Sequence, residues 1–154
     1  MCMVRARRGF SKSEVLSFPA KDIFSIVLDV EKYPAFLPWC KEVVILERHD
    51  ASMFVKLVAQ FMSLEGAYTS EVSFSTPTLE NPGWIRAVST DGVFNTLCSE
   101  WNFLPKNERE TLVTFFVNFS FKNRMLQFAF DMASSMAISN ISRAFKNRAY
   151  QLLK

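Results

Sequence analysis

Residues able to do acid, base or nucleophilic chemistry are few in this chain, and they lie far apart. His49 is the only histidine and stands beside Asp50 in an expected turn. General-base and nucleophilic catalysis both need a second group within hydrogen-bond reach, and the sequence offers His49 no evident nucleophile. Glu65, Glu71 and Glu100 belong to separate segments, and we expect Glu71 and Glu100 on the outer, solvated faces of strands. These residues favour a binding protein over an enzyme.

The cysteines and glycines also lack the spacing of a chemical site. Cys2, Cys40 and Cys98 form no C-x-x-C pair and have no histidine cluster beside them, so the sequence predicts no metal site. Cys40 is more typical of a small buried hydrophobe than of a reactive thiol. The four glycines, at positions 9, 66, 83 and 92, form neither a phosphate-binding loop nor a nucleophile elbow.

A segment with two prolines separates the first expected helix from the strands that follow. Pro34 and Pro38 each remove a backbone donor and push the preceding residue out of helical geometry, so the chain bends twice within five residues. Phe36, Leu37 and Trp39 are carried on this bend. Such side chains either close the mouth of a cavity or plug the end of a sheet.

The composition is that of one domain rich in aromatic side chains. The chain has 154 residues, which is enough for a single core, and 16 of them are Phe. Its 18 basic and 15 acidic residues give a net charge of +3, which permits weak attraction to anionic lipid or RNA but does not indicate a DNA partner. We expect one domain over residues 1–154 with a flexible N-terminus over residues 1–10, and neither a membrane span nor a secretory or transit segment.

Alternating apolar and polar residues predict a series of antiparallel strands joined by short turns. The alternation is strongest over residues 113–121. The predicted strands cover residues 15–18, 43–47, 53–61, 68–74, 84–90, 96–104 and 113–121, and a helix over residues 20–30 follows the first strand.

Beyond Asn123 the apolar period becomes helical. One stripe is made of Leu126, Phe130, Ala133, Ala137, Ile141 and Ala144, widened by Met125, Ala129, Met132 and Met136. A helix with so broad an apolar face must lie on an apolar surface. The order of elements therefore predicts an α+β helix-grip fold, in which a curved antiparallel sheet wraps around a long C-terminal helix.

A curved sheet wrapped around a helix leaves a gap that is a usual place for a ligand. The side chains expected in this gap are apolar, and flexible methionines adapt to a long chain or a flat ring. The alternative is that the same side chains only form the core, as most Phe and Met stripes do. The predicted ligand-binding residues are Tyr33, Phe36, Leu37, Pro38, Trp39, Phe61, Phe74, Phe94, Trp101, Phe119, Phe121, Phe128, Met132 and Met136.

The segment Asp29–Trp39 resembles the signature of the coenzyme Q-binding START-domain family, which includes the ribosome association toxin A group. Every fixed position of the family's aspartate-valine-acidic-x-tyrosine-proline-x-phenylalanine-leucine-proline-tryptophan run is filled here. Residues 91–103 are similar to the family's glycine-proline-phenylalanine, leucine and tryptophan-x-phenylalanine pattern, and residues 144–149 resemble the end of its last helix. Val93 is a departure, because the family usually has proline there.

The resemblance implies a START or birch-pollen-allergen-like fold of the polyketide cyclase-like superfamily, with a lipid cavity. It implies binding and delivery of ubiquinone or a related polyprenyl quinone in support of respiratory electron transport, with no other cofactor. The segment 33–40 and the C-terminal helix would form the gate of that cavity. The implied location is the bacterial cytoplasm, in peripheral contact with the inner membrane, or the matrix side of the mitochondrial inner membrane in a eukaryote.

The other branch of the same family implies a different function. Its members are described as toxins that bind the large ribosomal subunit and block subunit association. A basic surface for that role is available from Lys122, Arg124, Arg143, Lys146 and Arg148. A polyketide cyclase activity is a third interpretation, for which the sequence offers no acid or base residue.

Overall fold

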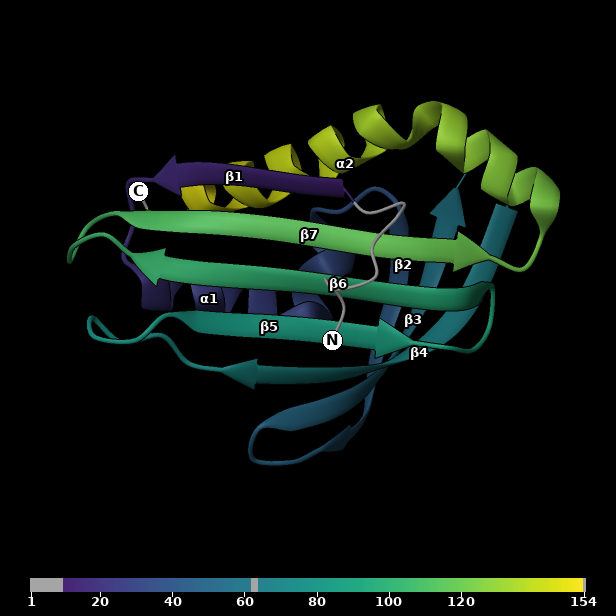
Figure 1. Cartoon of the computed structure of the whole chain (residues 1–154). Coiled ribbons are helices and arrows are strands. Elements are labelled where there is room, and N and C mark those ends of the chain that lie inside the picture. The colour runs from purple at the N-terminus through teal and green to yellow at the C-terminus, as the bar shows by residue number, and fades with distance from the viewer. Residues whose placement is uncertain (1–9, 62–63, 154) are drawn as a thin grey trace.

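The computed structural model describes residues 10–61 and 64–153, and its seven strands form one antiparallel sheet in the order β1-β7-β6-β5-β4-β3-β2 (Figure 1). From β2 to β7 each strand pairs with the next along the chain, and β1 pairs with β7. The strands are β1 (Phe10–Leu16), β2 (Cys40–Arg48), β3 (Ser52–Phe61), β4 (Leu64–Ser75), β5 (Gly83–Ser89), β6 (Phe94–Pro105) and β7 (Thr111–Phe121).

Three helical elements complete the fold, namely α1 (Ala20–Leu28), the 3-10 helix η1 (Val30–Ala35) and the long helix α2 (Arg124–Leu153). Figure 1 shows α1 behind the strands β5 and β6, while α2 runs past β7 and β1. The sheet curves around these elements, so the predicted α+β helix-grip fold is confirmed. The expected single domain over residues 1–154 stays a prediction.

Alternation along the strands builds the core on the side of the sheet that faces the helices. Trp101 lies beside Phe115, and Phe103 lies beside Val113, in the pairing of β6 with β7. All four side chains are buried, and Phe24 of α1 packs on Phe103 with ring centroids 5.6 Å apart. The period-two pattern of the sequence therefore corresponds to the observed inner face.

The first strand begins earlier than its apolar residues indicate. The sequence predicts a strand from residue 15, whereas β1 starts at Phe10 and pairs with β7 as far as Leu16. Ser11 and Ser13 are exposed in this strand, so backbone pairing at the sheet edge, rather than side-chain burial, extends it. The expected flexible segment 1–10 lies outside the described residues except for Phe10.

The opposite edge of the sheet is β2, and its pairing with β3 is irregular. The register shifts between Cys40 and Glu42 and again between Ile45 and Glu47. A shift of this kind is a β-bulge, which bends a strand and increases its twist. The bulges bend β2 at the end of the sheet where η1 packs.

The turn before β6 is held by one glycine and one carboxylate. Gly92 has a φ of +63°, and a Cβ added there would lie 1.9 Å from the carbonyl oxygen of Ala67. Asp91 accepts hydrogen bonds from the Thr69 backbone N–H at 2.8 Å and from the Ser89 hydroxyl at 3.1 Å. The Thr69 bond is the main reason why the pKa of Asp91 is lowered.

Val93 replaces the proline that the resemblance expects in this turn. A Cβ added to Gly66 would lie 2.1 Å from Cγ1 of Val93, so the valine side chain occupies the space above the glycine. The Val93 carbonyl also accepts a hydrogen bond from the Lys122 backbone N–H at 3.1 Å. Packing and hydrogen bonding thus fix Val93 without a proline ring.

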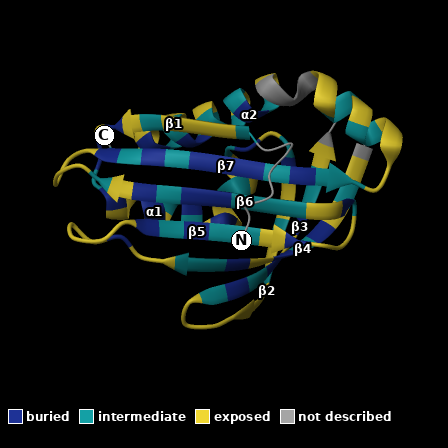
Figure 2. Cartoon of the chain, in the orientation of Figure 1, coloured by how far each residue is buried: buried dark blue, intermediate teal, exposed yellow. Residues whose placement is uncertain are grey.

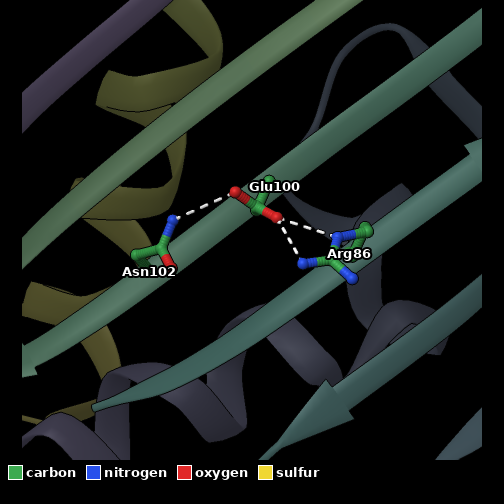
Figure 3. A network of polar contacts seen from close by, with 3 residues as sticks. All are labelled: Arg86, Glu100 and Asn102. Carbon is green, nitrogen blue, oxygen red and sulfur yellow. Dashed lines mark hydrogen bonds and ion pairs between the residues drawn. The ribbon is translucent and has the colours of Figure 1, made fainter. Parts of the chain in front are cut away.

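The outer face of β5 and β6 carries a buried ion pair (Figure 3). Arg86 donates from Nε and Nη2 to the same carboxylate oxygen of Glu100, each at 2.8 Å, and Asn102 donates to the other oxygen at 3.4 Å. Glu100 is only 6% exposed. The prediction that Glu100 is solvated was wrong, because the cross-strand arginine supplies the partner that a buried carboxylate needs.

Candidate functional site

A cavity of about 800 Å³ lies between the inner face of the sheet, the segment that follows η1, and α2. Its floor is made of alternate residues of five strands: Val55, Leu57, Ala59, Tyr68, Ser70, Val72, Ile85, Ala87, Leu97, Ser99, Trp101, Phe115, Val117, Phe119 and Phe121. Because side chains alternate along a strand, each strand contributes every second residue to this floor. The floor is therefore almost entirely apolar.

The two-proline segment closes one side of the cavity. Pro34 lies inside η1, and the Leu37 backbone N–H donates to the Tyr33 carbonyl at 2.8 Å, which completes the bend. Tyr33, Phe36, Leu37, Pro38 and Trp39 all line the cavity, and Leu37 is only 1% exposed. The sequence allowed this segment either to close the mouth of a cavity or to plug the end of the sheet. In the structure the segment is packed and also forms a cavity wall, so the two interpretations are compatible.

One aromatic cluster joins this segment to α2 and to the sheet. Phe145 of α2 lies at its centre, with ring centroids 5.3 Å from Tyr33, 5.2 Å from Phe36 and 4.8 Å from Trp101. All three pairs meet nearly edge to face, a favourable arrangement for aromatic rings. Phe145 thus fixes the last turns of α2 against the wall of the cavity.

A second aromatic cluster lies where α2 begins. Phe130 of α2 packs on Phe119 with ring centroids 4.5 Å apart and on Phe121 at 5.5 Å. Phe94 stacks on Phe121 at 4.8 Å and meets Tyr68 at 4.9 Å. The cavity therefore runs between two groups of aromatic rings that hold α2 to the sheet.

Apart from Tyr33, Trp39, Tyr68, Ser70 and Ser99, the polar side chains of the cavity lining lie along one edge of α2 and at the ends of two strands: Gln60, Glu65, Asn140, Arg143, Asn147, Arg148 and Gln151. Glu65 is paired with Lys41 at 2.8 Å, and the Arg148 guanidinium lies 5.2 Å from the ring centroid of Phe36. Within residues 10–61 and 64–153, neither Arg143 nor Arg148 has a carboxylate partner within 4.0 Å. This polar rim is rich in hydrogen-bond donors and carries uncompensated positive charge.

Tyr33 and Tyr68 of the cavity lining, and the thiol of Cys40, are held in their neutral forms. Burial raises the pKa of Tyr33 and of Tyr68, and it raises the pKa of the Cys40 thiol from 9.0 to about 11. The Tyr33 hydroxyl donates a hydrogen bond to the Val27 carbonyl. Cys40 is therefore a protonated thiol at neutral pH, and it is buried, as the sequence predicted.

One polar atom of the wall is left without a partner. The indole Nε1 of Trp39 is enclosed by protein atoms and makes no hydrogen bond with any described residue. A buried donor without an acceptor costs about 1–3 kcal/mol. Trp39 is thus held less favourably than the rings around it.

Nine of the predicted ligand-binding residues line the cavity: Tyr33, Phe36, Leu37, Pro38, Trp39, Phe94, Trp101, Phe119 and Phe121. Phe74 does not, because it packs on Phe24 of α1 with ring centroids 6.3 Å apart. The side chain of Phe61 lies outside the described part of the chain.

Three predicted residues of α2 point away from the cavity. Phe128, Met132 and Met136 are exposed and do not line it. The prediction was wrong because the apolar residues of this helix cover more than one face, and the inner face is made by Leu126, Phe130 and residues following Ala137.

Several cavity residues were missed by the sequence analysis. Phe145, Arg143 and Arg148 line the cavity, but they were treated only as parts of a terminal motif or of a basic surface. Phe145 follows Ile141 by four residues, so helical spacing alone was a signal for it. No spacing in the sequence marks Arg143 and Arg148 as cavity residues, because their place at the polar rim depends on where the sheet ends.

Neither a metal cluster nor a membrane-spanning helix is found in the described part of the chain. No group of three or more metal-ligating side chains comes together there, and none of the described helices is long and apolar enough to cross a bilayer. His49 lies on the hairpin between β2 and β3, half exposed, 3.1 Å from Glu47 and outside the cavity lining.

An apolar cavity in a helix-grip fold agrees with the comparison to known families. The family described as "Polyketide cyclase / dehydrase and lipid transport" matches residues 16–146. The chain belongs to this family. Membership of this family does not by itself assign an activity, because the chemistry of a site depends on its own side chains.

Two curated relatives carry different names. The "Ribosome association toxin RatA" of Rickettsia prowazekii is 30% identical over 95% of this chain and 99% of its own length. The "Coenzyme Q-binding protein COQ10, mitochondrial" of Drosophila melanogaster is 30% identical over 77% of this chain and 49% of its own length, so the match covers about half of that relative. Both names belong to the family suspected from the signature of residues 29–39.

A solved structure supports the fold at lower identity. The Zhui aromatase/cyclase from Streptomyces sp. R1128 superposes with a TM-score of 0.78 at 15% identity, covering 96% of each chain. At this identity the likeness concerns the fold alone. It shows that this chain shares its helix-grip arrangement with that solved structure.

Proposed function

We propose that this chain binds a polyprenyl quinone of the ubiquinone type between α2 and the sheet and delivers it in support of respiratory electron transport. The cavity of about 800 Å³ carries this proposal, because its volume lies within the range of about 300–1,000 Å³ common for small-molecule sites. The name of the Drosophila relative supports the choice of ligand. The protein acts as a carrier, without catalysis and without another cofactor.

The distribution of polar groups suggests how the ligand would lie. An isoprenoid tail suits the apolar floor between the two aromatic clusters, where it is shielded from water. The carbonyl oxygens of the quinone ring need donors, and Asn147 and Arg148 at the polar rim supply them. The tail therefore enters first, and the ring stays close to the opening.

Loading requires an opening, and the segment 33–40 with the facing end of α2 forms its gate. Phe36 packs against both Phe145 and the guanidinium of Arg148 on α2, so movement of this segment would uncover the cavity from the rim side. The unpaired Nε1 of Trp39 lowers the cost of leaving the closed position, because moving the ring to water provides an acceptor.

The test is the ligand content of the purified protein. We expect organic extraction followed by mass spectrometry to identify a quinone with a polyprenyl tail. Ala137→Phe places a ring in the cavity that Ala137 lines, and this variant should lose the lipid. Ala51→Phe adds the same atoms at an exposed turn and should retain it. An empty protein, or a lipid retained by Ala137→Phe, contradicts the proposal.

A second candidate function is binding to the large ribosomal subunit and blocking of subunit association. It is favoured by the Rickettsia relative, whose name is that of a ribosome association toxin and which matches this chain over nearly its full length. Lys122, Arg124 and Arg143 are exposed along α2 and offer positive charge to RNA phosphates. Lys146 is less available, because it is paired with Glu14 of β1.

Cosedimentation with purified large subunits distinguishes the two functions. A toxin of this kind should sediment with the subunit and be released as salt rises, since phosphate contacts weaken with ionic strength. An Arg124→Gln/Arg143→Gln variant should be released at lower salt. A protein that carries quinone and stays in the supernatant supports the carrier alone.

The cellular location proposed for the carrier follows from its ligand. A polyprenyl quinone resides in membranes, so the protein must reach a membrane surface to load it. We therefore propose the bacterial cytoplasm with peripheral contact to the inner membrane, or the matrix face of the mitochondrial inner membrane in a eukaryote. Fractionation of cells before and after a salt wash tests this location.

A further inference from the structure

The first half of α2 displays a row of large apolar side chains to solvent. Met125, Phe128, Met132 and Met136 are 82%, 69%, 76% and 70% exposed. Successive members are three or four residues apart, so they lie on one side of the helix. We call these four residues the outer stripe. Figure 2 shows exposed residues along this part of α2, above the sheet.

An exposed row of this size is unusual for a free surface. Scattered apolar residues are common on proteins, but a contiguous apolar patch marks a contact with a partner or a membrane. The outer stripe does not line the cavity, whose residues on this half of the helix are Leu126 and Phe130. Binding of the quinone therefore leaves the outer stripe uncovered.

The charged residues around the outer stripe are mainly basic. Lys122 and Arg124 are exposed at its beginning. Arg143 is exposed beyond its end, and it follows Met136 by seven residues, which places it on the same side of the helix. Asp131, the one acidic residue in the sequence of α2, follows Phe128 by three residues and so lies at the edge of the outer stripe, where it accepts a hydrogen bond from Gln127 at 2.9 Å. The row is thus apolar with basic ends.

We infer that the outer stripe docks α2 on the surface of a bilayer that contains anionic lipid. Helices with Phe and other apolar residues on one side and basic residues near them lie in the membrane interface, held by apolar burial and by attraction to anionic headgroups. Methionine side chains are flexible and adapt to a fluid surface. Neither of the two pockets lined by described residues includes a member of the outer stripe, so a flat partner fits the row better than a peptide.

The docked position also has a consequence for the cavity. Arg143 continues the line of the outer stripe and at the same time lines the cavity at the polar rim. A bilayer in contact with the outer stripe and Arg143 therefore lies next to the opening. The inference rests on the membrane contact proposed above and deepens it, because it assigns the surface of the protein that meets the bilayer and the headgroup charge that this surface requires.

Vesicle flotation tests the inference with the full chain. We expect the protein to float with vesicles of phosphatidylcholine and phosphatidylglycerol and to stay behind with phosphatidylcholine alone. The variant Phe128→Ser/Met132→Ser removes apolar contact and should lower the bound fraction about tenfold or more. Leu79→Ser changes an exposed leucine in the connection between β4 and β5, and this control should bind as the wild type does.

The outcomes separate docking from the other partners. Equal flotation of the double variant and the wild type overturns the inference. The inference is also overturned if neither protein binds vesicles and sedimentation equilibrium finds a dimer for the wild type but a monomer for the double variant. The outer stripe would then be the contact with a second copy of the chain. The lipid extracted from the purified double variant should match that of the wild type, so failure of docking and failure of the quinone proposal are distinguishable.

Discussion

Apolar residues of α2 lie in two different surroundings. From the middle of the helix onward, Ile138, Phe145 and Ala149 are buried against the sheet and the neighbouring helical elements. In the first half the outer stripe is exposed. The spacing of apolar residues along a helix predicts which of them share a side. The position of the helix on the sheet determines which side is covered. A broad apolar helix can therefore be packed at one end and displayed at the other.

The contrast is sharpest for two phenylalanines of the same helix. Phe145→Ala should lower the free energy of unfolding by about 3–5 kcal/mol, because the ring contacts Tyr33, Phe36 and Trp101 and its loss leaves a cavity. Phe128→Ala should change it by less than about 0.5 kcal/mol. Urea unfolding followed by far-ultraviolet circular dichroism measures both. Similar losses for the two variants would break the comparison.

Adding volume distinguishes packed positions from positions on the cavity. Ala149 is buried, so Ala149→Leu should cost about 1–3 kcal/mol through overpacking. Ala137 lines the cavity, so the same change there should cost less than about 1 kcal/mol, since the side chain enters free space. Thermal unfolding of the two variants gives the order. A larger loss at Ala137 than at Ala149 would mean that the cavity is closed in solution.

Alkaline pH should lower the stability of the packed region around Cys40. The pKa of Cys40 is raised from 9.0 to about 11 in the folded protein, so its contribution to stability is present below about pH 9 and is lost as the pH rises through about 11. We expect the melting temperature to fall by a few degrees between about pH 8 and pH 10. The fall should be smaller for Cys40→Ala. An equal fall of the melting temperature in both proteins would show that ionisation of Tyr33 and Tyr68, rather than of Cys40, causes the fall.

The smallest effect is expected on the outer stripe itself. Met132→Gln should leave the free energy of unfolding within about 0.5 kcal/mol of the wild type, because the side chain is exposed. Ile138→Gln, in the packed half, serves as the matched comparison and should cost more than about 2 kcal/mol. Chemical denaturation measures both variants. A loss above about 1 kcal/mol for Met132→Gln would show that the outer stripe is covered.

Most of the fold could be predicted from local patterns. The strands, the long helix and the bend at Pro34 and Pro38 follow from period-two alternation, helical spacing and the geometry of proline. The early start of β1 could not be predicted, since Ser11 and Ser13 give no apolar signal and are held by pairing with β7. The Arg86–Glu100 pair was missed for a similar reason, because it depends on the cross-strand register.

The candidate site was predictable to the extent that its residues lie on strands or on the signature segment. Trp101, Phe119 and Phe121 follow from alternation, because a strand has only two faces. A helix has no such restriction, so the broad apolar surface of α2 did not reveal that Met132 faces outward while Phe130 faces inward. Only the position of the helix over the sheet decides between them.

The bulges of β2 protect the molecule from unwanted self-association. As the last strand of the sheet, β2 has no strand partner on one side among residues 10–61 and 64–153, and it also exposes Val44 and Leu46. A flat edge of this kind invites another chain to add a strand, which is the first step toward aggregation. Two register shifts bend the edge, and the charges of Lys41, Glu42, Glu47 and Arg48 surround its apolar residues. The bent, charged edge strand therefore makes fibre formation through the sheet edge less favourable, although the outer stripe of α2 is exposed.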